Sequence, residues 1–219
     1  MNRNRSRRGA GRAPVWLAVL VFLSAQPPST SSGQAQHENA AAPVPEAWLS
    51  EVTRRISEEQ RLPQKVEGGF LLHAGETHAR LDGRGVAVGD WRLEPLGEAA
   101  SPEVEGNRVV YRRGGGITEW YQALPQGLEQ GFTIEARPED DLVLSAKVES
   151  PGRVDILDEG LAFGGLRYTG LHAEDAAGRP LHARMEWEEH QRTLSLRIDR
   201  KSTRLNSSHI QKSRMPSSA

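Results

Sequence analysis

The chain has 219 residues and nearly balanced charge, with 28 lysines and arginines against 29 aspartates and glutamates. It contains no cysteine, which excludes disulfide bonds, zinc sites built on thiolates and thiol nucleophiles. The charge is unevenly placed: residues 1–25 carry five arginines and no acid, and residues 199–219 carry five basic residues and one acid. Residues 26–198 therefore have a net charge of −10, and an acidic domain repels nucleic-acid phosphates.

The N-terminus has the layout of a secretory signal peptide. Five arginines precede an apolar run from Val15 to Ala25, as a charged region precedes the apolar region of such peptides. We expect residues 1–25 to be removed by cleavage after Ala25, with Ala35 as the other cleavage position. The run is shorter than the roughly 20 apolar residues that cross a bilayer, so no stable membrane span is expected after cleavage; an uncleaved anchor is the alternative. These features predict an exported protein, located in the periplasm, at the cell surface or outside the cell.

A disordered leader and one helix are predicted next. Residues 26–45 are rich in Pro, Ser, Ala and Gln and lack apolar periodicity. A helix is predicted from Pro45 to Arg61, ended by Pro63. Its apolar residues fall on one stripe, namely Trp48, Leu49, Val52 and Ile56. We expect this stripe to pack on a sheet; binding of a partner is the alternative.

From Phe70 to Ile198 the sequence has the pattern of β-strands. Apolar residues alternate with polar ones in short runs, and turn residues separate the runs. Asp82-Gly83 predicts a hairpin between two such runs, and Asp175–Gly178 predicts a second. The pattern predicts an all-β, antiparallel, sandwich-like domain with one N-terminal amphipathic helix, over residues 46–198.

The stretch from Ile117 to Ile134 holds the densest aromatic and turn signals of the chain. Its two ends are β-rich, and Pro125 and Gly127 interrupt the middle. We therefore expect two strands of an antiparallel sheet joined by a structured crossing loop. Glu129 and Gln130 are expected on that loop.

The C-terminal residues 199–219 differ in character from the rest. Asp199–His209 and Ser213–Ala219 resemble the translation of a sequencing-library adapter, with residues 210–212 where an index would lie. We expect this tail to be non-native and disordered. The native protein is then expected to continue beyond Ile198, so that the domain is truncated.

Metal sites have weak support in the sequence. The candidate histidines, His172, His182 and His190, lie on separate runs and lack an obvious third ligand. Calcium is the candidate ion for three acidic turns, but none has the EF-hand spacing, so solvated turns are the favoured explanation. These turns contain Glu139-Asp140-Asp141, Asp155 with Asp158-Glu159, and Glu174-Asp175. We therefore predict no cofactor.

Two further groups are candidates for chemistry or binding. Glu119 and Glu129 flank the central loop and are the candidate pair for a glycosidase, which needs two carboxylates across a cleft. No nucleotide-binding motif or nucleophile elbow accompanies them, so no enzyme is predicted. The candidate ligand face is aromatic, made of Trp91, Trp120, Tyr121 and Trp187. Each of these residues sits in an apolar alternation, so a place in the core is favoured over a ligand face.

Several motifs together resemble a bacterial family. They are Asn107–Gly114, Thr118–Tyr121, Gly127–Ile134, Leu166–Leu171, Glu174–Arg184 and Leu194–Asp199. The chain resembles the β-rich N-terminal domain that precedes FG-GAP, integrin-alpha-type β-propeller repeats in secreted and surface proteins. The resemblance implies a non-catalytic structural or presenting module with a downstream propeller domain as its partner. A carbohydrate- or protein-binding module that uses the aromatic face is the alternative.

Overall fold

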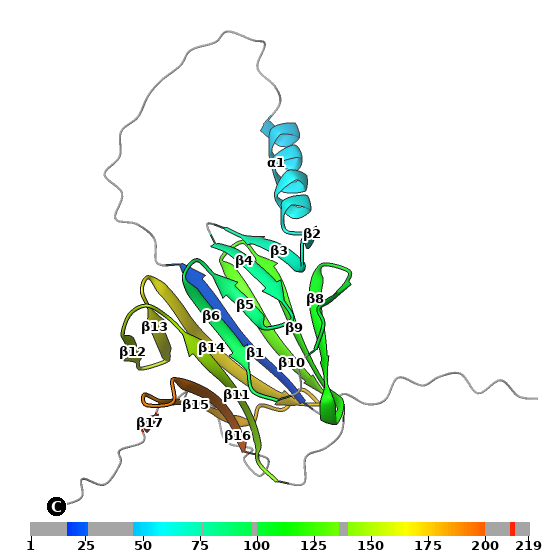
Figure 1. Ribbon diagram of the computed structural model, residues 1–219. Coiled ribbons are helices and arrows are strands. Elements are labelled where there is room, and N and C mark those ends of the chain that lie inside the picture. Colours follow the sequence, from blue (N-terminus) through cyan, green and yellow to red (C-terminus); the bar gives the residue numbers. More distant parts are fainter. Residues whose placement is uncertain are drawn as a thin grey trace, which may run out of the picture.

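The computed structural model describes residues 17–25, 46–75, 77–97, 100–135, 140–199 and 211–212. The described strands form two sheets that face each other (Figure 1), and all named strand pairs are antiparallel except β15 with β17. The predicted all-β, antiparallel, sandwich-like fold with one helix is confirmed. Among these residues no helix combines the length and the apolar character needed to cross a membrane.

Eight strands make the first sheet, in the spatial order β12 (Val154–Leu157), β13 (Gly160–Phe163), β14 (Leu166–Asp175), β1 (Leu17–Ala25), β10 (Gly127–Ile134), β9 (Ile117–Leu124), β8 (Arg108–Arg113) and β7 (Glu103–Glu105). Nine make the second, in the order β17 (Gln211–Lys212), β15 (His182–Glu188), β16 (Thr193–Asp199), β11 (Leu142–Glu149), β6 (Trp91–Pro95), β5 (Gly85–Val88), β4 (Thr77–Asp82), β3 (Gly69–Ala74) and β2 (Gln64–Val66). The remaining elements are α1 (Glu46–Gln60) and the 3-10 turn η1 (Gly114–Gly116).

The core lies between the sheets and follows the alternation of the strands. In β16, for example, Leu194, Leu196 and Ile198 are buried, and the residues between them are partly exposed. Contacts between the sheets include the rings of Trp91 and Phe163, whose centroids are 5.5 Å apart. Offset aromatic pairs at such distances add to the free energy gained by burial.

The segment expected to be a signal peptide contributes a central strand. β1 pairs antiparallel with β10 on one side and with β14 on the other, and Val21 is fully buried (Figure 1). Cleavage of this segment stays a prediction. Residues 1–16 of the expected signal peptide and the expected leader, 26–45, lie outside the described residues. Of the tail, the structure describes Asp199, which ends β16, and Gln211–Lys212, which forms β17.

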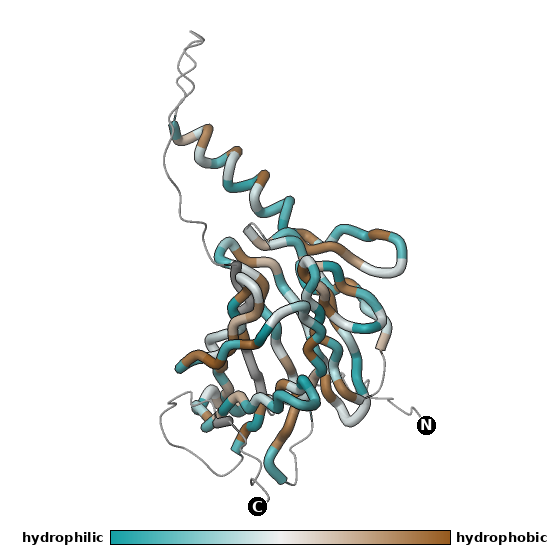
Figure 2. Tube along the Cα trace, turned by 60° about the vertical axis from the view of Figure 1, so that its left-hand side comes forward, coloured by the Kyte–Doolittle hydropathy of each residue, from teal (hydrophilic) through white to brown (hydrophobic). Residues whose placement is uncertain are grey.

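The expected packing of the helix on a sheet is wrong. α1 projects away from the sandwich and has no buried residue (Figure 2). Trp48, Leu49 and Ile56 are 57, 47 and 49% exposed. The helix has ion pairs of its own instead, since Arg54 bonds to both Glu51 and Glu58 one turn away on either side.

The expected crossing loop in the stretch 117–134 is also wrong. β9 and β10 are longer than predicted and join through a two-residue turn, Pro125-Gln126. Leu124 pairs with Gly127 across this turn, so Glu129 and Gln130 lie on a strand. Proline and glycine interrupt strands, but here they occupy the turn itself, and alternation resumes directly after it.

Gly131 leaves room for the ring of Trp120 to pack directly on the backbone of this hairpin. A Cβ added to it would lie 2.1 Å from Cζ2 of Trp120, whose ring covers the glycine. We expect Gly131→Ala to lower the free energy of unfolding by about 1–3 kcal/mol, the usual cost of overpacking. Gly152→Ala is the matched control, because no heavy atom lies within 4 Å of its added Cβ. Urea denaturation of both variants checks this, and equal midpoints would contradict it.

Candidate functional site

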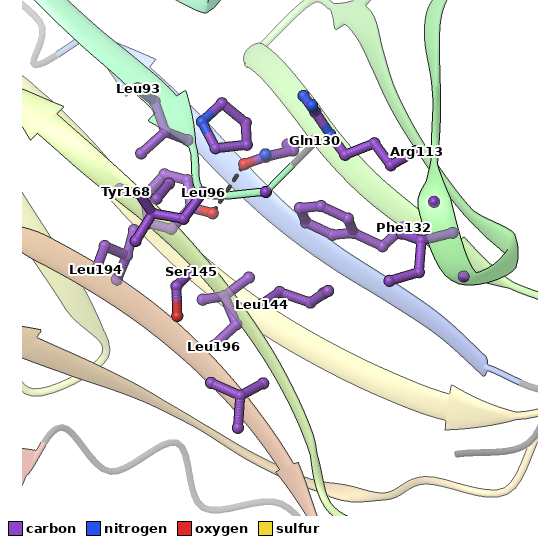
Figure 3. Close-up of a pocket in the computed structure, with 17 residues that line it drawn as sticks. Leu93, Leu96, Arg113, Gln130, Phe132, Leu144, Ser145, Tyr168, Leu194 and Leu196 are labelled. Carbon is purple, nitrogen blue, oxygen red and sulfur yellow. Dashed lines mark hydrogen bonds between the residues drawn. The ribbon is translucent and has the colours of Figure 1, made fainter. Parts of the chain in front are cut away.

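The strongest candidate site is a pocket between the two sheets, with a volume of about 360 Å³ (Figure 3). We call it the inter-sheet pocket. Its lining is mostly apolar and comes from both sheets and from η1. The apolar lining includes Leu93, Leu96, Ile117, Phe132, Leu144, Leu194 and Leu196, and the polar side chains are Arg113, Gln130, Ser145 and Tyr168. A pocket of this composition suits an apolar group, because few polar atoms are available to orient a polar one.

A buried side-chain network lies along the first-sheet wall of the pocket. We call it the Glu119 network; its members are Arg113, Glu119, Tyr121, Gln130 and Tyr168. Glu119 is fully buried and accepts from Arg113 Nε at 2.6 Å, from the Tyr121 hydroxyl at 2.6 Å and from Gln130 Nε2 at 2.7 Å. The Tyr168 hydroxyl donates to Gln130 Oε1 at 2.8 Å (Figure 3).

Strand register brings these groups together. Gln130 of β10 lies opposite Tyr121 of β9, and Glu119 is two residues from Tyr121 on the same face. Arg113 ends β8 next to η1, from which its guanidinium reaches Glu119. A buried charge is tolerated only when it is paired and hydrogen-bonded, and here both carboxylate oxygens have partners.

The burial of Glu119 in this network is incompatible with the predicted glycosidase pair of Glu119 and Glu129. Glu119 faces the interior, whereas Glu129 alternates with the buried residues Leu128 and Gln130 and lies on the outer face of the same sheet. Burial raises the pKa of Glu129, opposed by the charge of Arg108. Two carboxylates on opposite faces of one sheet cannot flank one glycosidic bond.

The aromatic ligand face is not formed by its four predicted residues. Trp91, Trp120, Tyr121 and Trp187 are 1 to 6% exposed, so their rings are closed to a sugar. Three of them belong to the core cluster between the sheets, as the favoured interpretation expected. Trp120 lies on the outer face instead, where the guanidinium of Arg108 stacks on it with Cζ 3.7 Å from a ring centroid.

The histidines and acidic turns are not brought together. His182 begins β15 and His190 follows its end, while His172 lies on β14 beside Glu174. Within the described part of the chain, no group of three His, Asp or Glu residues could hold a metal ion. Asp175 is used in its hairpin turn, where it accepts from the backbone of Ala177 and Arg179. Glu139 lies outside the described residues.

Sequence reasoning missed the Glu119 network and a histidine pair. His73 and His78 face each other on β3 and β4, with Nδ1 atoms 2.7 Å apart. A signal for the network was present in the sequence. Glu119 and Gln130 occupy positions whose neighbours two residues away are apolar or aromatic, so both side chains had to be buried and bonded.

Comparison with known proteins gives no match: no family model, no curated protein and no solved structure matches the chain.

The buried ion pair predicts a large effect of one substitution. Glu119→Ala leaves Arg113, which is largely buried, without its carboxylate, and we expect a loss of about 3–5 kcal/mol in the free energy of unfolding. Glu105→Ala is the control, because Glu105 and Arg112 form an exposed pair, for which the expected change is below about 1 kcal/mol. Chemical denaturation measures both. Similar losses in the two variants would show that the network is not important for stability.

The tyrosines predict instability at alkaline pH. All three, Tyr111, Tyr121 and Tyr168, have raised pKa values, first because they are buried and second because of the charge of Glu119. A tyrosine in the unfolded chain ionises near pH 10. Below about pH 10 the three buried tyrosines therefore contribute their full stabilisation. Above it the unfolded chain loses protons before the folded protein does, so the folded state becomes less stable relative to the unfolded one.

We therefore expect the free energy of unfolding to fall by about 4 kcal/mol per pH unit above about pH 10, which is about 1.4 for each tyrosine. Denaturation at a series of pH values gives the slope, and phenolate absorbance should appear only on unfolding. Tyr168→Phe should reduce the slope by about one third, since one titrating group is lost. Phenolate absorbance in the folded protein near pH 10 would contradict this expectation.

Proposed function

We propose that the chain is a non-catalytic structural module of an exported bacterial protein, which presents or caps a following domain. By the resemblance of its motifs, that domain is a β-propeller.

The observation that carries this proposal is the state of the polar groups in the inter-sheet pocket. Arg113 bonds to Glu119, Gln130 bonds to Tyr168, and the hydroxyls of Ser145 and Ser195 are 2.8 Å apart. Each polar side chain of the lining is thus paired with another protein group. Catalysis needs groups placed toward a reacting atom, whereas groups bonded to one another stabilise the domain.

A second candidate is protein binding through α1. It is favoured by the exposure of Trp48, Leu49 and Ile56, which gives the helix an apolar face toward solvent. Amphipathic helices use such faces to enter apolar grooves of partner proteins. Quenching of Trp48 fluorescence by acrylamide, with and without the native following domain, separates the candidates. Protection of Trp48 supports docking through the helix, and unchanged quenching leaves presentation by the sandwich alone.

The export part of the proposal is tested by the N-terminus of the mature protein. Expressed in a bacterial host, the chain should be exported and should begin at residue 26 or 36. Leu20→Arg places a charge in the apolar region, so we expect the uncleaved precursor to accumulate in the cytoplasm. Asn39→Arg, beyond both cleavage positions, is the control. An intact N-terminus on exported protein would contradict cleavage.

A further inference from the structure

The place of β1 in the first sheet makes its removal consequential. β10 and β14 run in the same direction, and each pairs antiparallel with β1 between them. We call the space that β1 fills the central gap. Without β1 the sheet separates into β7–β10 and β12–β14, because no other strand of the described residues joins these two parts. The strands beside the gap are two strand spacings apart, about 9.6 Å, too far for direct backbone hydrogen bonds.

The occupant of the gap is the apolar part of the predicted signal peptide. If export removes Leu17–Ala25, the backbone groups of β10 and β14 that face the gap lose their partners. A buried backbone group without a partner costs about 1–3 kcal/mol. Several such groups along two strands would cost more than a domain can lose. This step rests on the export in the proposed function.

The sequence of β1 also lacks the apolar–polar alternation of a strand in this sheet. Positions 18 and 22 of β1 pair with Thr133 and Glu129, which are outer-face positions of the sheet. A strand with one face toward solvent carries polar residues there, as β10 does. β1 has Ala18 and Phe22 at these positions instead, which suits a signal peptide better than a sandwich strand.

The interior beside the gap is incompletely filled. Gln130, Phe132 and Tyr168, opposite positions 21, 19 and 23 of β1, line the inter-sheet pocket of about 360 Å³. Protein interiors are close-packed, with few voids larger than a water molecule. A strand with larger apolar side chains opposite Gln130 and Phe132 would fill part of this space.

We propose that the central gap is an acceptor site for an extended segment donated by the native polypeptide that follows β16, and that Leu17–Ala25 of the predicted signal peptide occupies it only before cleavage. The donated segment alternates apolar residues, bulky opposite Gln130 and Phe132, with polar residues on the outer face. This is addition of a β-strand, with affinity from backbone hydrogen bonds and selectivity from alternate side chains.

The topology supplies a short route for this donor. β16 ends at Asp199, which pairs with His182 at the start of β15. The hairpin from β14 to β15 brings Asp175 to the same end, and Asp175 lies opposite Leu17, where β1 begins. A chain leaving Asp199 therefore reaches the entrance of the gap directly. It then runs in the direction of β1, antiparallel to both neighbours.

The test uses the full chain, folded before any cut is made. A protease site is placed within residues 26–45, and residues 200–219 are replaced by a short Gly-Ser linker and a second copy of Leu17–Ala25. After proteolysis, size-exclusion chromatography and mass spectrometry measure whether the N-terminal fragment stays bound. A tethered strand has an effective concentration of order mM. At micromolar protein the tethered strand should therefore be favoured over the free fragment by a factor of about 10³ in the occupancy of the gap.

Two control chains accompany this one. The first carries the cut site without the grafted strand. The second has the change Val21→Pro in the grafted copy only, which removes a backbone donor and disfavours a central strand. Both should keep the fragment. Retention in all three chains, or release from all three, would overturn the proposal.

A third graft tests the pattern of the donor. The changes Ala18→Thr and Phe22→Glu in the grafted copy give it polar residues at the two outer-face positions, and it should release the fragment at least as completely as the unchanged copy. Failure to do so would overturn the proposed alternation. The assay does not depend on secretion, so a chain that fails to be exported but exchanges its strand would sink only the export proposal.

Discussion

A hydrogen bond between two side chains, from Tyr168 to Gln130, crosses the middle of the first sheet over β1. It is the outer link of a series that continues from Gln130 to Glu119 and from Glu119 to Arg113. The series runs across the strands, from β14 over β1 to β10, β9 and the end of β8. One link of the series, from Tyr168 to Gln130, joins β14 to β10, which are not adjacent, and the other links join neighbouring strands. The bond from Tyr168 to Gln130 therefore adds a side-chain link to the backbone pairing through β1 that holds the two parts of the sheet together.

The network also limits what the interior can do. A buried carboxylate is costly to desolvate, and a hydrophobic replacement of similar volume is often as stable, so a buried ion pair alone is weak support for stability. Its geometric demands are stricter than those of apolar packing, because a shift of one residue would turn Glu119 or Gln130 to the outer face. Gln130 bonds to Glu119, Tyr121 and Tyr168, so both polar atoms of its side chain have protein partners.

The sequence of this chain reveals local structure more fully than tertiary contacts. Alternation in Leu194, Leu196 and Ile198 predicted a strand and its buried face correctly, because one period of two decides both. The stripe of α1 predicted a helix correctly, but an apolar stripe does not reveal what covers it, and Trp48 is exposed. The hairpin at Pro125 was missed because proline and glycine mark a turn without giving its length. Part of the Glu119 network could have been predicted, since the alternation of the strand places Glu119 among core positions. The contribution of Tyr168 could not, because its bond to Gln130 depends on the pairing of β10 and β14 with β1.

β1 shows why one stretch of sequence can fit both a signal peptide and a central strand. The export machinery responds to an apolar run after positive charge, and the centre of a sheet accepts an apolar run of similar length, so Leu17–Ala25 meets both requirements. Only the outer-face register distinguishes them, because a sandwich strand has to alternate and a signal peptide does not. If a later segment replaces β1, the sheet is completed only after that segment has been synthesised. The following domain would then be attached through a strand bonded on both edges, which ties its position to the folded sandwich more firmly than a flexible linker would.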